Sequence, residues 1–493
     1  MVRKSLVGVV GALVATGCHA PPAATLTIGP VAPISMGAKV SGIRSLEISS
    51  GDTVSALDAS TDRIELASLN TSGAVSLRIT TDDGSAANVG GVDVPSGTWV
   101  PLPVTQLAKG TAVPVAVSGS AGPSHTFELA TLPADFPEYT VQANQPKPGI
   151  VCFTATASDA THPSYLFITD QGGQPLYYKK LAAKGFDFQR CLAPDGSARY
   201  SYFQQDGPQV AGVSSPMGTV HLLDGKYQEL KSLAVLAHGD HGALPADVHE
   251  FVYLDDDHYI VTACAAKTVT NVPSQAGAPS NVAAAIIQEV QGGQVVFEWD
   301  STQYPEFYAN ASDGNEYTNA TVPCADYMHL NSVYIDPNDG NLIVSFRHQD
   351  QVVKLDRKSG AILWRLGGKN GDFPLADAQK FSHQHFARQN ADATLTLFDN
   401  GNALGASRLQ SFKLDEAAKA VTAYDAFAPE SRYSVAMGDV QKLDASTFFF
   451  GWGAHPAGVS DASEVTRAGV TTFSLTFADP VYSSYRALKY LTP

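Results

Sequence analysis

The stretch "VVKLDRKSGAILWRLGG", residues 352–368, decides the fold. It contains an apolar strand-like run, a polar turn that includes Gly360, and a second run that ends in two glycines. Alternation with a period of two is typical of β-strands, and a glycine-containing turn between two such runs predicts a hairpin.

This hairpin pattern recurs along the later two thirds of the chain at intervals of roughly 60 residues. Related segments are "YLFITDQGGQPLYYKKL" (165–181), "VHLLDGKYQELKSL" (220–233), "IIQEVQGGQVVFEWD" (286–300), "LQSFKLDEAAKAVTAYDAF" (409–427) and "TFSLTFADPVYSSYRALKY" (472–490). A second type of hairpin lies between them. It comprises "QRCLAPDGSARYSYF" (189–203), "HEFVYLDDDHYIVTAC" (249–264), "LNSVYIDPNDGNLIVSFR" (330–347), "HFARQNADATLTLFDNG" (385–401) and "GDVQKLDASTFFFGWG" (438–453).

Two hairpins in each repeat predict a four-stranded sheet, and six such sheets predict an all-β protein with a six-bladed β-propeller over residues 150–493. The spacing of the repeats is irregular, which leaves seven blades open.

Residues 25–131 differ from the rest, because they hold short alternating runs and almost no aromatic side chains. Examples are "VSLRITT" (75–81) and "HTFELATL" (125–132). Short strands at regular spacing predict a small β-sandwich domain. The proline-containing residues 132–149 are predicted to link it to the propeller domain.

The composition is that of a folded protein, since 44% of the 493 residues are hydrophobic and 16% are charged. A net charge of −16 argues against nucleic acid as a partner, because its phosphates would be repelled. An anionic substrate would also need a locally positive pocket.

Residues 1–18 have the features of a signal peptide, with Arg3 and Lys4 before a short apolar stretch. The segment ends in "VATGC", which resembles a bacterial lipobox and implies lipid on Cys18; a plain secretory signal is the alternative. Either reading predicts export to the periplasm or cell envelope, with membrane contact only through that lipid.

Four further cysteines follow at positions 152, 191, 264 and 324. In an exported protein an even number suggests disulfides, of unknown pairing, and buried free thiols are the alternative. No CxxC motif or Cys–His spacing predicts a zinc site.

Histidines recur at one point of the second hairpin pattern. His249 stands at its start in one repeat, His329 precedes it in the next, and His383 and His385 form "HQH" at its start in the one after. In a propeller the first strand of each blade lines the central channel, so these residues are expected to meet at one mouth of it. Asn331 lies beside His329, and Arg347 ends the same hairpin.

A guanidinium among several imidazoles suits a small oxyanion, because its fork matches two oxygens of a sulfate, phosphate or carboxylate. Three histidines could instead bind zinc, but a guanidinium beside a divalent metal is repelled, so we expect no metal and no cofactor. Taken singly, His162, His221 and His348 are set aside as solvated or packed, and Asp399-Asn400-Gly401 as a turn.

The segments "DVHEF", "DYMHLNSVYIDPNDGNLIVSFRHQDQVVKLDRKSGAILWRLGG" and "FSHQHFARQNADATLTLFDNG" resemble, in order, conserved blocks of bacterial aryl-sulfate sulfotransferases. The likeness covers roughly residues 150–490. It implies a six-bladed propeller that transfers a sulfuryl group from a small aryl sulfate to a phenol through a sulfohistidine, without a nucleotide donor.

The resemblance implies that His385 is the nucleophile, that His249, His329 and Arg347 hold the sulfuryl oxygens, and that Asn331 assists them. His383 is expected to contact the substrate. The sequence departs from the family at "HEF" and "HFAR", which leaves the general acid open. Tyr327, Phe386 and Trp452 are candidates for stacking on a phenol ring. The alternatives are a non-catalytic propeller that binds an anionic ligand or a protein, and a metal-dependent ester hydrolase.

Overall fold

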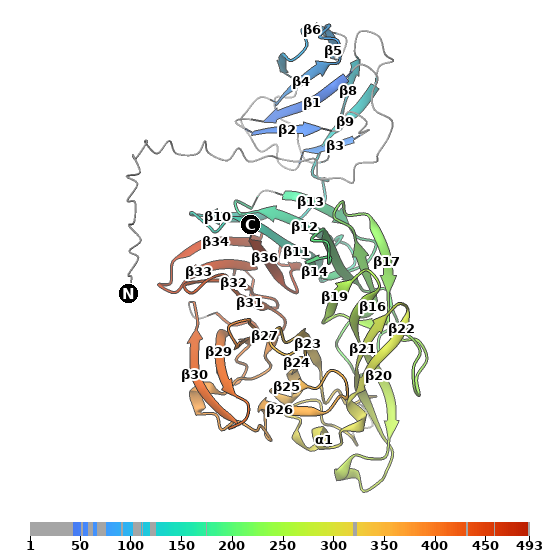
Figure 1. Ribbon diagram of the computed structural model, residues 1–493, viewed down its shortest axis with the longest axis vertical. Helices are drawn as coiled ribbons and strands as arrows, with labels where there is room; N and C mark the ends of the chain where they lie inside the picture. Colours follow the sequence, from blue (N-terminus) through green and yellow to red (C-terminus); the bar gives the residue numbers. More distant parts are fainter. Residues whose placement is uncertain are drawn as a thin grey trace, which may run out of the picture.

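The structure is a computed structural model, and it describes residues 43–50, 53–57, 63–66, 75–89, 92–101, 110, 112–118, 125–173, 175–318, 323–429, 432–457 and 459–491. The predicted signal peptide and Cys18 lie outside these residues. The regular secondary structure of the described chain is nearly all β-strand (Figure 1). Its helical segments are α1 (Glu306–Asn310) and the 3₁₀ turns η1 (Pro273–Gln275), η2 (Ser301–Gln303), η3 (Arg347–Gln349) and η4 (Asp377–Gln379). None of the helices in these ranges is both long and apolar enough to cross a membrane.

The N-terminal region forms two sheets, in the orders β2-β1-β4-β7 and β3-β9-β8-β5-β6. Their strands are β1 (Ile43–Ser50), β2 (Thr53–Leu57), β3 (Arg63–Leu66), β4 (Val75–Thr81), β5 (Ala87–Val89), β6 (Val92–Val94), β7 (Trp99–Pro101), β8 (Ala112–Ser118) and β9 (His125–Thr131). All pairs are antiparallel except β3 with β9. These strands fall within residues 25–131, where the sequence predicts a small β-sandwich domain.

Six sheets make up the rest of the described chain. The first sheet contains β11 (Gly149–Ala157), β12 (Tyr165–Asp170), β13 (Pro175–Lys180), the short β35 (Tyr482–Ser483) and β36 (Ala487–Leu491), and the second contains β14 (Gly185–Leu192), β15 (Ala198–Gln204), β16 (Met217–Leu223), β17 (Glu229–Leu233) and the short β18 (Ala246–Asp247). The third contains β19 (Phe251–Asp255), β20 (His258–Val269), β21 (Ser280–Gln291) and β22 (Gln294–Asp300), and the fourth contains β23 (Leu330–Ile335), β24 (Leu342–Phe346), β25 (Gln351–Leu355) and β26 (Ile362–Gly367). The fifth contains β27 (His385–Gln389), β28 (Thr394–Asp399), β29 (Arg408–Asp415) and β30 (Ala420–Phe427), and the sixth contains β31 (Asp439–Lys442), β32 (Thr447–Gly451), β33 (Ala462–Thr466) and β34 (Thr471–Phe477) with β10 (Tyr139–Ala143).

The two ends of this region are tied into its sheets. The C-terminal strand β36 pairs with β11, and β10 pairs with β34 of the sixth sheet. Residues 139–143, which the sequence assigns to the linker, are therefore a strand of that sheet. Phe136, from the same predicted linker, is buried against Tyr165 and Phe167 of the first sheet.

The hairpin over residues 352–368 shows how neighbouring sheets pack. Asp356 Oδ1 accepts hydrogen bonds from the backbone N–H groups of Lys358 and Ser359 and so stabilises the turn between β25 and β26. On β25, Val353 packs into the cluster around Trp299 of the third sheet, whereas Val352 packs into the cluster around Phe412 of the fifth. Both faces of the fourth sheet are thus covered, which explains its nearly continuous apolar strands.

One edge strand of each sheet lies toward the middle of the domain (Figure 1). A cavity of about 400 Å³ is lined by residues from all six of these strands. They include Gln189 of β14, Phe251 of β19, Val333 of β23, Arg388 of β27, Val440 of β31 and Leu488 of β36. The strands therefore converge on one central space, and residues at their starts come from different sheets to one end of it.

Candidate active site

His249 and His329 precede the central strands of two consecutive sheets, and their rings lie 5.0 Å apart between centroids. Each ring has an aspartate partner: His249 Nδ1 is 2.5 Å from Asp247 Oδ1, and His329 Nδ1 is 2.6 Å from Asp326 Oδ2. A carboxylate only accepts, so both Nδ1 atoms carry hydrogen and both Nε2 atoms are left for other partners. Burial lowers the pKa of His249.

His385, at the start of β27, is 1% exposed, and its tautomer follows from its neighbours. The amide nitrogen of Asn400 donates to the carbonyl oxygens of Ser434 and Met437, so its Oδ1 must accept the 2.7 Å hydrogen bond from His385 Nδ1. The lone pair then lies on Nε2, where the Met437 N–H donates to it at 3.2 Å.

The pKa of His385 is well below its usual range, first because the ring is buried and then because Arg347 is near. The imidazole is therefore neutral at pH 7. A neutral imidazole whose proton is fixed on one nitrogen offers the other nitrogen as a nucleophile.

Arg347 begins η3, directly after β24, and its backbone N–H donates to the His329 carbonyl oxygen at 3.0 Å. Among the described residues its guanidinium makes no ion pair, and its one side-chain hydrogen bond is a 3.4 Å contact from Nη2 to the Val435 carbonyl oxygen. Burial lowers its pKa, and the nearby Asp313, Asp326 and Asp350 only partly offset this effect. A half-buried guanidinium with so few partners is available to an anion.

His383 and Asn331 lie beside this group. The His383 backbone N–H donates to Asp350 Oδ1 at 2.7 Å, and its buried Nδ1 has no hydrogen-bond partner among the described residues. Asn331 is fully buried; its amide nitrogen donates to the Gln384 carbonyl oxygen at 2.6 Å, and its Oδ1 is unpartnered in the same sense. Asn331 thus fixes the backbone between the two histidines of "HQH".

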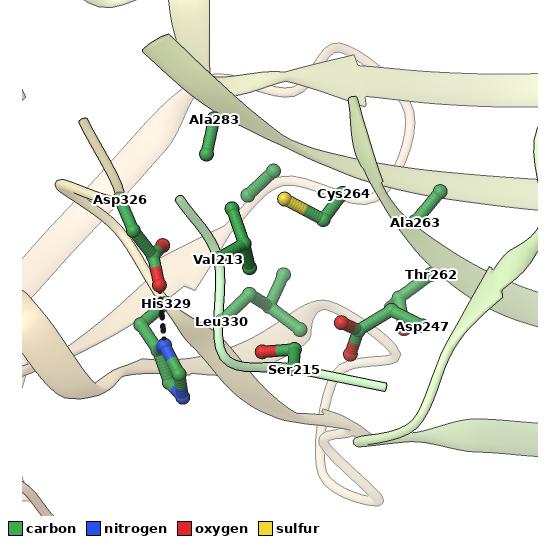
Figure 2. Close-up of a pocket in the computed structure, with 11 residues that line it drawn as sticks. Val213, Ser215, Asp247, Thr262, Ala263, Cys264, Ala283, Asp326, His329 and Leu330 are labelled. Atoms are coloured by element: carbon green, nitrogen blue, oxygen red, sulfur yellow. Dashed lines mark hydrogen bonds and ion pairs between the residues drawn. The ribbon is translucent and has the colours of Figure 1, made fainter. Parts of the chain in front are cut away.

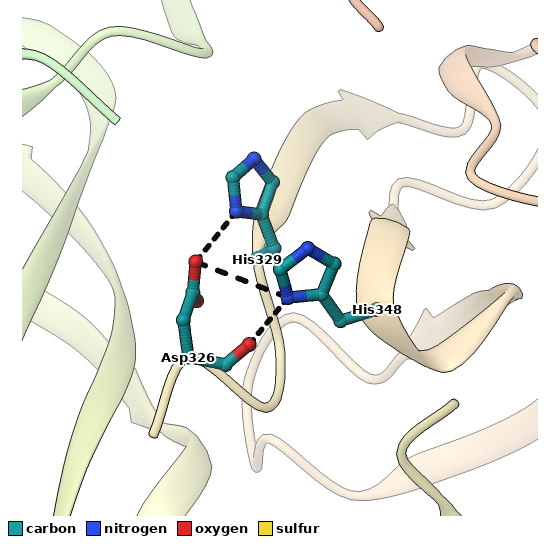
Figure 3. Close-up of side chains that lie close together, drawn as sticks. All are labelled: Asp326, His329 and His348. Atoms are coloured by element: carbon teal, nitrogen blue, oxygen red, sulfur yellow. Dashed lines mark hydrogen bonds and ion pairs between the residues drawn. The ribbon is translucent and has the colours of Figure 1, made fainter. Parts of the chain in front are cut away.

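His348, which the sequence analysis sets aside, belongs to the same cluster (Figure 3). Its ring centroid is 4.5 Å from that of His329 and 6.1 Å from that of His383. Its Nδ1 donates to the Asp326 carbonyl oxygen at 2.5 Å. Burial first, and His329 second, lower its pKa to about 4. No sequence signal separates it from other histidines, because its place in the repeat differs from that of His249 and His329.

Asp326, His329 and His348 are also the group that could hold a metal ion, since one ligand atom from each lies within 4.8 Å of the others. Carboxylate and imidazole ligands are suitable for Zn²⁺. However, the Asp326 carboxylate is already satisfied by His329 Nδ1, and its pKa is held at about 2 by the surrounding histidines although burial alone would raise it.

The backbone at the cluster is strained. His329, Asp350, His383, Phe386 and Met437 all have positive φ angles, between 47° and 63°. Side chains other than glycine adopt this region rarely and at a free-energy cost, and such residues concentrate at functional sites. The sequence gives no sign of this strain, because none of the five is glycine.

Beside His329 lies a small cavity of about 10 Å³, lined in part by Asp247, Asp326, Ser215 and Cys264 (Figure 2). This volume holds about one water molecule. The two carboxylates that orient His249 and His329 therefore line the same small space and place negative charge beside the histidines. The cationic pocket expected from the sequence is thus supplied mainly by Arg347.

Arg486, fully buried beneath the cluster, pairs with Asp187 at 2.9 Å and with Glu250 at 3.3 Å, and its Nη2 donates to the Asn331 carbonyl oxygen. Arg388 completes the network through Glu250 at 2.8 Å. The network therefore links β14 and β27 with the residues just before β19 and β36, and its members Glu250 and Arg388 line the 400 Å³ cavity.

The four cysteines at positions 152, 191, 264 and 324 all carry free thiols in the structure. The sequence left both disulfides and buried free thiols open, and the structure has free thiols. Burial raises the pKa of each thiol.

The arylsulfotransferase (ASST) family model matches residues 205–474, which is more than half of the chain and contains His249, His329, Arg347 and His385. The chain belongs to the arylsulfotransferase family. This confirms the resemblance found in the sequence. No curated protein matches the chain.

Solved structures similar to the chain include a protein of unknown function from Bacteroides caccae and the periplasmic gluconolactonase PpgL of Pseudomonas aeruginosa. Each has 11% sequence identity and a TM-score of 0.40, and each match covers 70% of this chain and 100% of the other. An inactive virginiamycin B lyase from Staphylococcus aureus is similar over 69% of this chain and 100% of its own, with 10% identity and a TM-score of 0.29.

The structure brings five predicted site residues into one cluster: His249, His329, Arg347, His383 and His385. The sequence does not predict Asn400, His348 or the backbone of Met437 as part of it. Of the three stacking candidates, Tyr327 and Trp452 are 0% and 1% exposed and belong to the packed interior, whereas Phe386 lines the 400 Å³ cavity.

Proposed function

We propose that the chain is an exported aryl-sulfate sulfotransferase that carries the sulfuryl group transiently on His385 Nε2. Membership of the arylsulfotransferase family supports the class of reaction. One observation supports His385 as the carrier: a neutral His385 with a fixed tautomer lies near the Arg347 guanidinium, which makes no ion pair with a described carboxylate.

In the first step the lone pair of His385 Nε2 attacks sulfur, a nitrogen–sulfur bond forms, and the bond from sulfur to the aryl oxygen breaks. The phenolate leaves with that electron pair and takes up a proton. In the second step a phenol oxygen attacks the same sulfur as it loses its proton, and the nitrogen–sulfur electrons return to Nε2. Each half-reaction conserves charge without a nucleotide donor or a cofactor.

Arg347, His249 and His329 would bind the sulfuryl oxygens, whose charge rises as the aryl oxygen departs. His249 or His329, when protonated at Nε2, would donate the proton that the leaving phenolate takes up. The Met437 N–H, which donates to Nε2 in the structure, would be released when Nε2 bonds to sulfur.

We further propose that the six sheets are the blades of a closed six-bladed propeller, supported by the pairing of β36 with β11. Export, with lipid on Cys18, rests on the N-terminal sequence alone.

Activity assays test the proposal with an aryl sulfate donor, a phenol acceptor and the variant His385→Ala. His221→Ala is the matched control, because His221 pairs with Glu229 of β17, at the outer edge of the second sheet. The proposal expects transfer to vanish in the first variant and to persist in the second. Equal rates in wild type and His385→Ala would overturn it.

The group Asp326, His329 and His348 favours one competing function, a metal-dependent ester hydrolase. Dialysis against a chelator separates the two: sulfuryl transfer that survives metal removal rules out the hydrolase, and activity that is lost and then restored by Zn²⁺ supports it.

A further inference from the structure

A second cavity, of about 530 Å³, lies in the sixth sheet beside the histidine cluster. Its wall comes from three segments: residues 433 and 435 before β31, residues 454–457, 459 and 461 between β32 and β33, and residues 477, 480, 482 and 483 from the end of β34 to β35. Pockets that bind small molecules have volumes of this order, with mostly apolar linings and a few polar groups.

The repeat places this cavity at the same end of the domain as the candidate active site. In the fourth sheet the Arg347 N–H, after the second strand, donates to the carbonyl oxygen of His329, before the first. In the sixth sheet the Ala454 N–H donates in the same way to the Ala436 carbonyl oxygen. The segments before β31 and after β32 are thus the counterparts of those that carry His329 and Arg347.

The two sites also share residues. The Val435 carbonyl oxygen accepts the hydrogen bond from Arg347, and Tyr433 is close enough to act on the Arg347 charge. Both residues line the cavity. Two residues further on, Met437 contacts His385 Nε2 through its backbone N–H. Residues 433–437 therefore supply both part of the cavity wall and direct contacts to Arg347 and His385.

The lining favours an uncharged ring. Tyr433, Val435, Pro456, Val459, Phe477 and Tyr482 supply apolar and aromatic surface. The ionisable pair in the wall, His455 and Asp461, is satisfied internally: His455 Nε2 is 3.1 Å from Asp461 Oδ1, and His455 Nδ1 is 2.9 Å from the Pro456 carbonyl oxygen. Their side chains are 8% and 3% exposed. The described wall thus presents no unpaired charge to a ligand.

We propose that this cavity binds the ring system of the substrate, and that its size selects uncharged phenols of two or more fused rings over phenol itself. The inference rests on the proposed function for the chemistry at His385, but ring binding can be measured without it. Apolar burial of the extra ring supplies the selectivity, as it does in other apolar pockets.

Two measurements test the proposal. The first is the ratio of kcat/KM for 2-naphthol to that for phenol, with one aryl sulfate donor, in wild type, Ala457→Trp and Val459→Phe. The second is calorimetric binding of 2-naphthol to His385→Ala and to its double variants with each substitution. Ala418→Trp, in the exposed turn between β29 and β30, controls for an added indole ring, and circular dichroism shows which variants fold.

We expect wild type to prefer 2-naphthol by at least roughly tenfold, consistent with one extra ring in an apolar pocket. Either pocket-filling variant should bring the ratio close to one and abolish calorimetric binding, whereas Ala418→Trp should change neither. Transfer activity with an unchanged ratio in both folded variants would overturn the pocket and leave the sulfotransferase standing. If wild type shows no transfer activity, but the pocket-filling variants abolish calorimetric binding of 2-naphthol, the result would support the pocket and overturn the sulfotransferase.

Discussion

Asn400 Oδ1 accepts a hydrogen bond of 2.7 Å from His385 Nδ1, across the antiparallel strands β27 and β28. Gly401 makes this placement possible: it has φ +66°, and a Cβ atom there would lie 1.9 Å from the Ala406 carbonyl oxygen. The tight turn holds the Asn400 side chain against two backbone carbonyl oxygens, those of Ser434 and Met437, and the imidazole. Asn400 is thus a positioning residue that decides which nitrogen of His385 carries the lone pair.

Replacing Asn400 by alanine should slow sulfuryl transfer about 10- to 100-fold, the usual effect of removing a partner that orients a reactive imidazole. The fall should appear in kcat, since no residue that binds the sulfuryl oxygens is removed. Asn390→Ala removes hydrogen bonds from the other end of the same hairpin and is the control. Equal kcat values for Asn400→Ala and Asn390→Ala would refute this role for Asn400.

Arg347→Lys should lower kcat/KM for the donor by roughly 10²- to 10³-fold, because the variant keeps the charge but loses the two-pronged donor that stabilises the departing group. The matched control is Arg365→Lys in the same sheet, where the guanidinium pairs with Glu306 outside the cluster. Steady-state kinetics with both variants check the prediction. A lysine that supports wild-type kcat/KM would show that bidentate binding is not needed.

The pH dependence of sulfohistidine formation follows from the lowered pKa of His385. An ordinary histidine is half protonated near pH 6.5, and protonation removes the lone pair. Because burial and Arg347 depress this pKa, the nucleophile stays neutral as the pH falls through 6.5. Rapid-quench rates should therefore be flat from pH 7.5 to pH 6, with the acid limb lying lower. A half-maximal rate at pH 6.5 would contradict the depressed pKa.

Arg486→Leu should destabilise the domain by about 3–5 kcal/mol, because it leaves the buried carboxylate of Asp187 without its ion-pair partner and leaves Glu250 paired with Arg388 alone. Arg467→Leu is the control: its ion pair with Asp425 is 42% and 48% exposed, so about 1 kcal/mol or less is expected. Denaturant unfolding measures both. Similar losses for the two variants would mean that the buried network is not a main source of stability.

The sequence predicts the strands well, because alternation and turn residues are local signals. The hairpin over 352–368 is one example, with its turn stabilised by Asp356 as the residue types suggest. The linker is mispredicted at residues 139–143, since pairing of β10 with β34 joins segments more than 300 residues apart in the chain. The polar, partly exposed pattern of β10 carries no trace of its partner.

The residues of the candidate site were likewise predicted only in part from the sequence. His249, His329 and His385 share a position in the repeat, so their convergence follows from the period. His348 and Asn400 were read singly, as a packed histidine and a turn residue, because their roles depend on contacts across strands and on the left-handed backbone at His329 and Met437. Such contacts are set by tertiary packing and leave no periodic signal.

The central claim is that His385 carries the sulfuryl group, and mass spectrometry of the intact protein and its peptides tests it most directly. The protein is mixed with an aryl sulfate without acceptor, quenched at alkaline pH and digested. The account predicts the added mass of one SO₃ on the peptide that contains His385, its absence in His385→Ala, and its loss when a phenol is added before the quench. Rapid turnover with no added mass on that peptide at any time point, or the same mass on another residue, would contradict it.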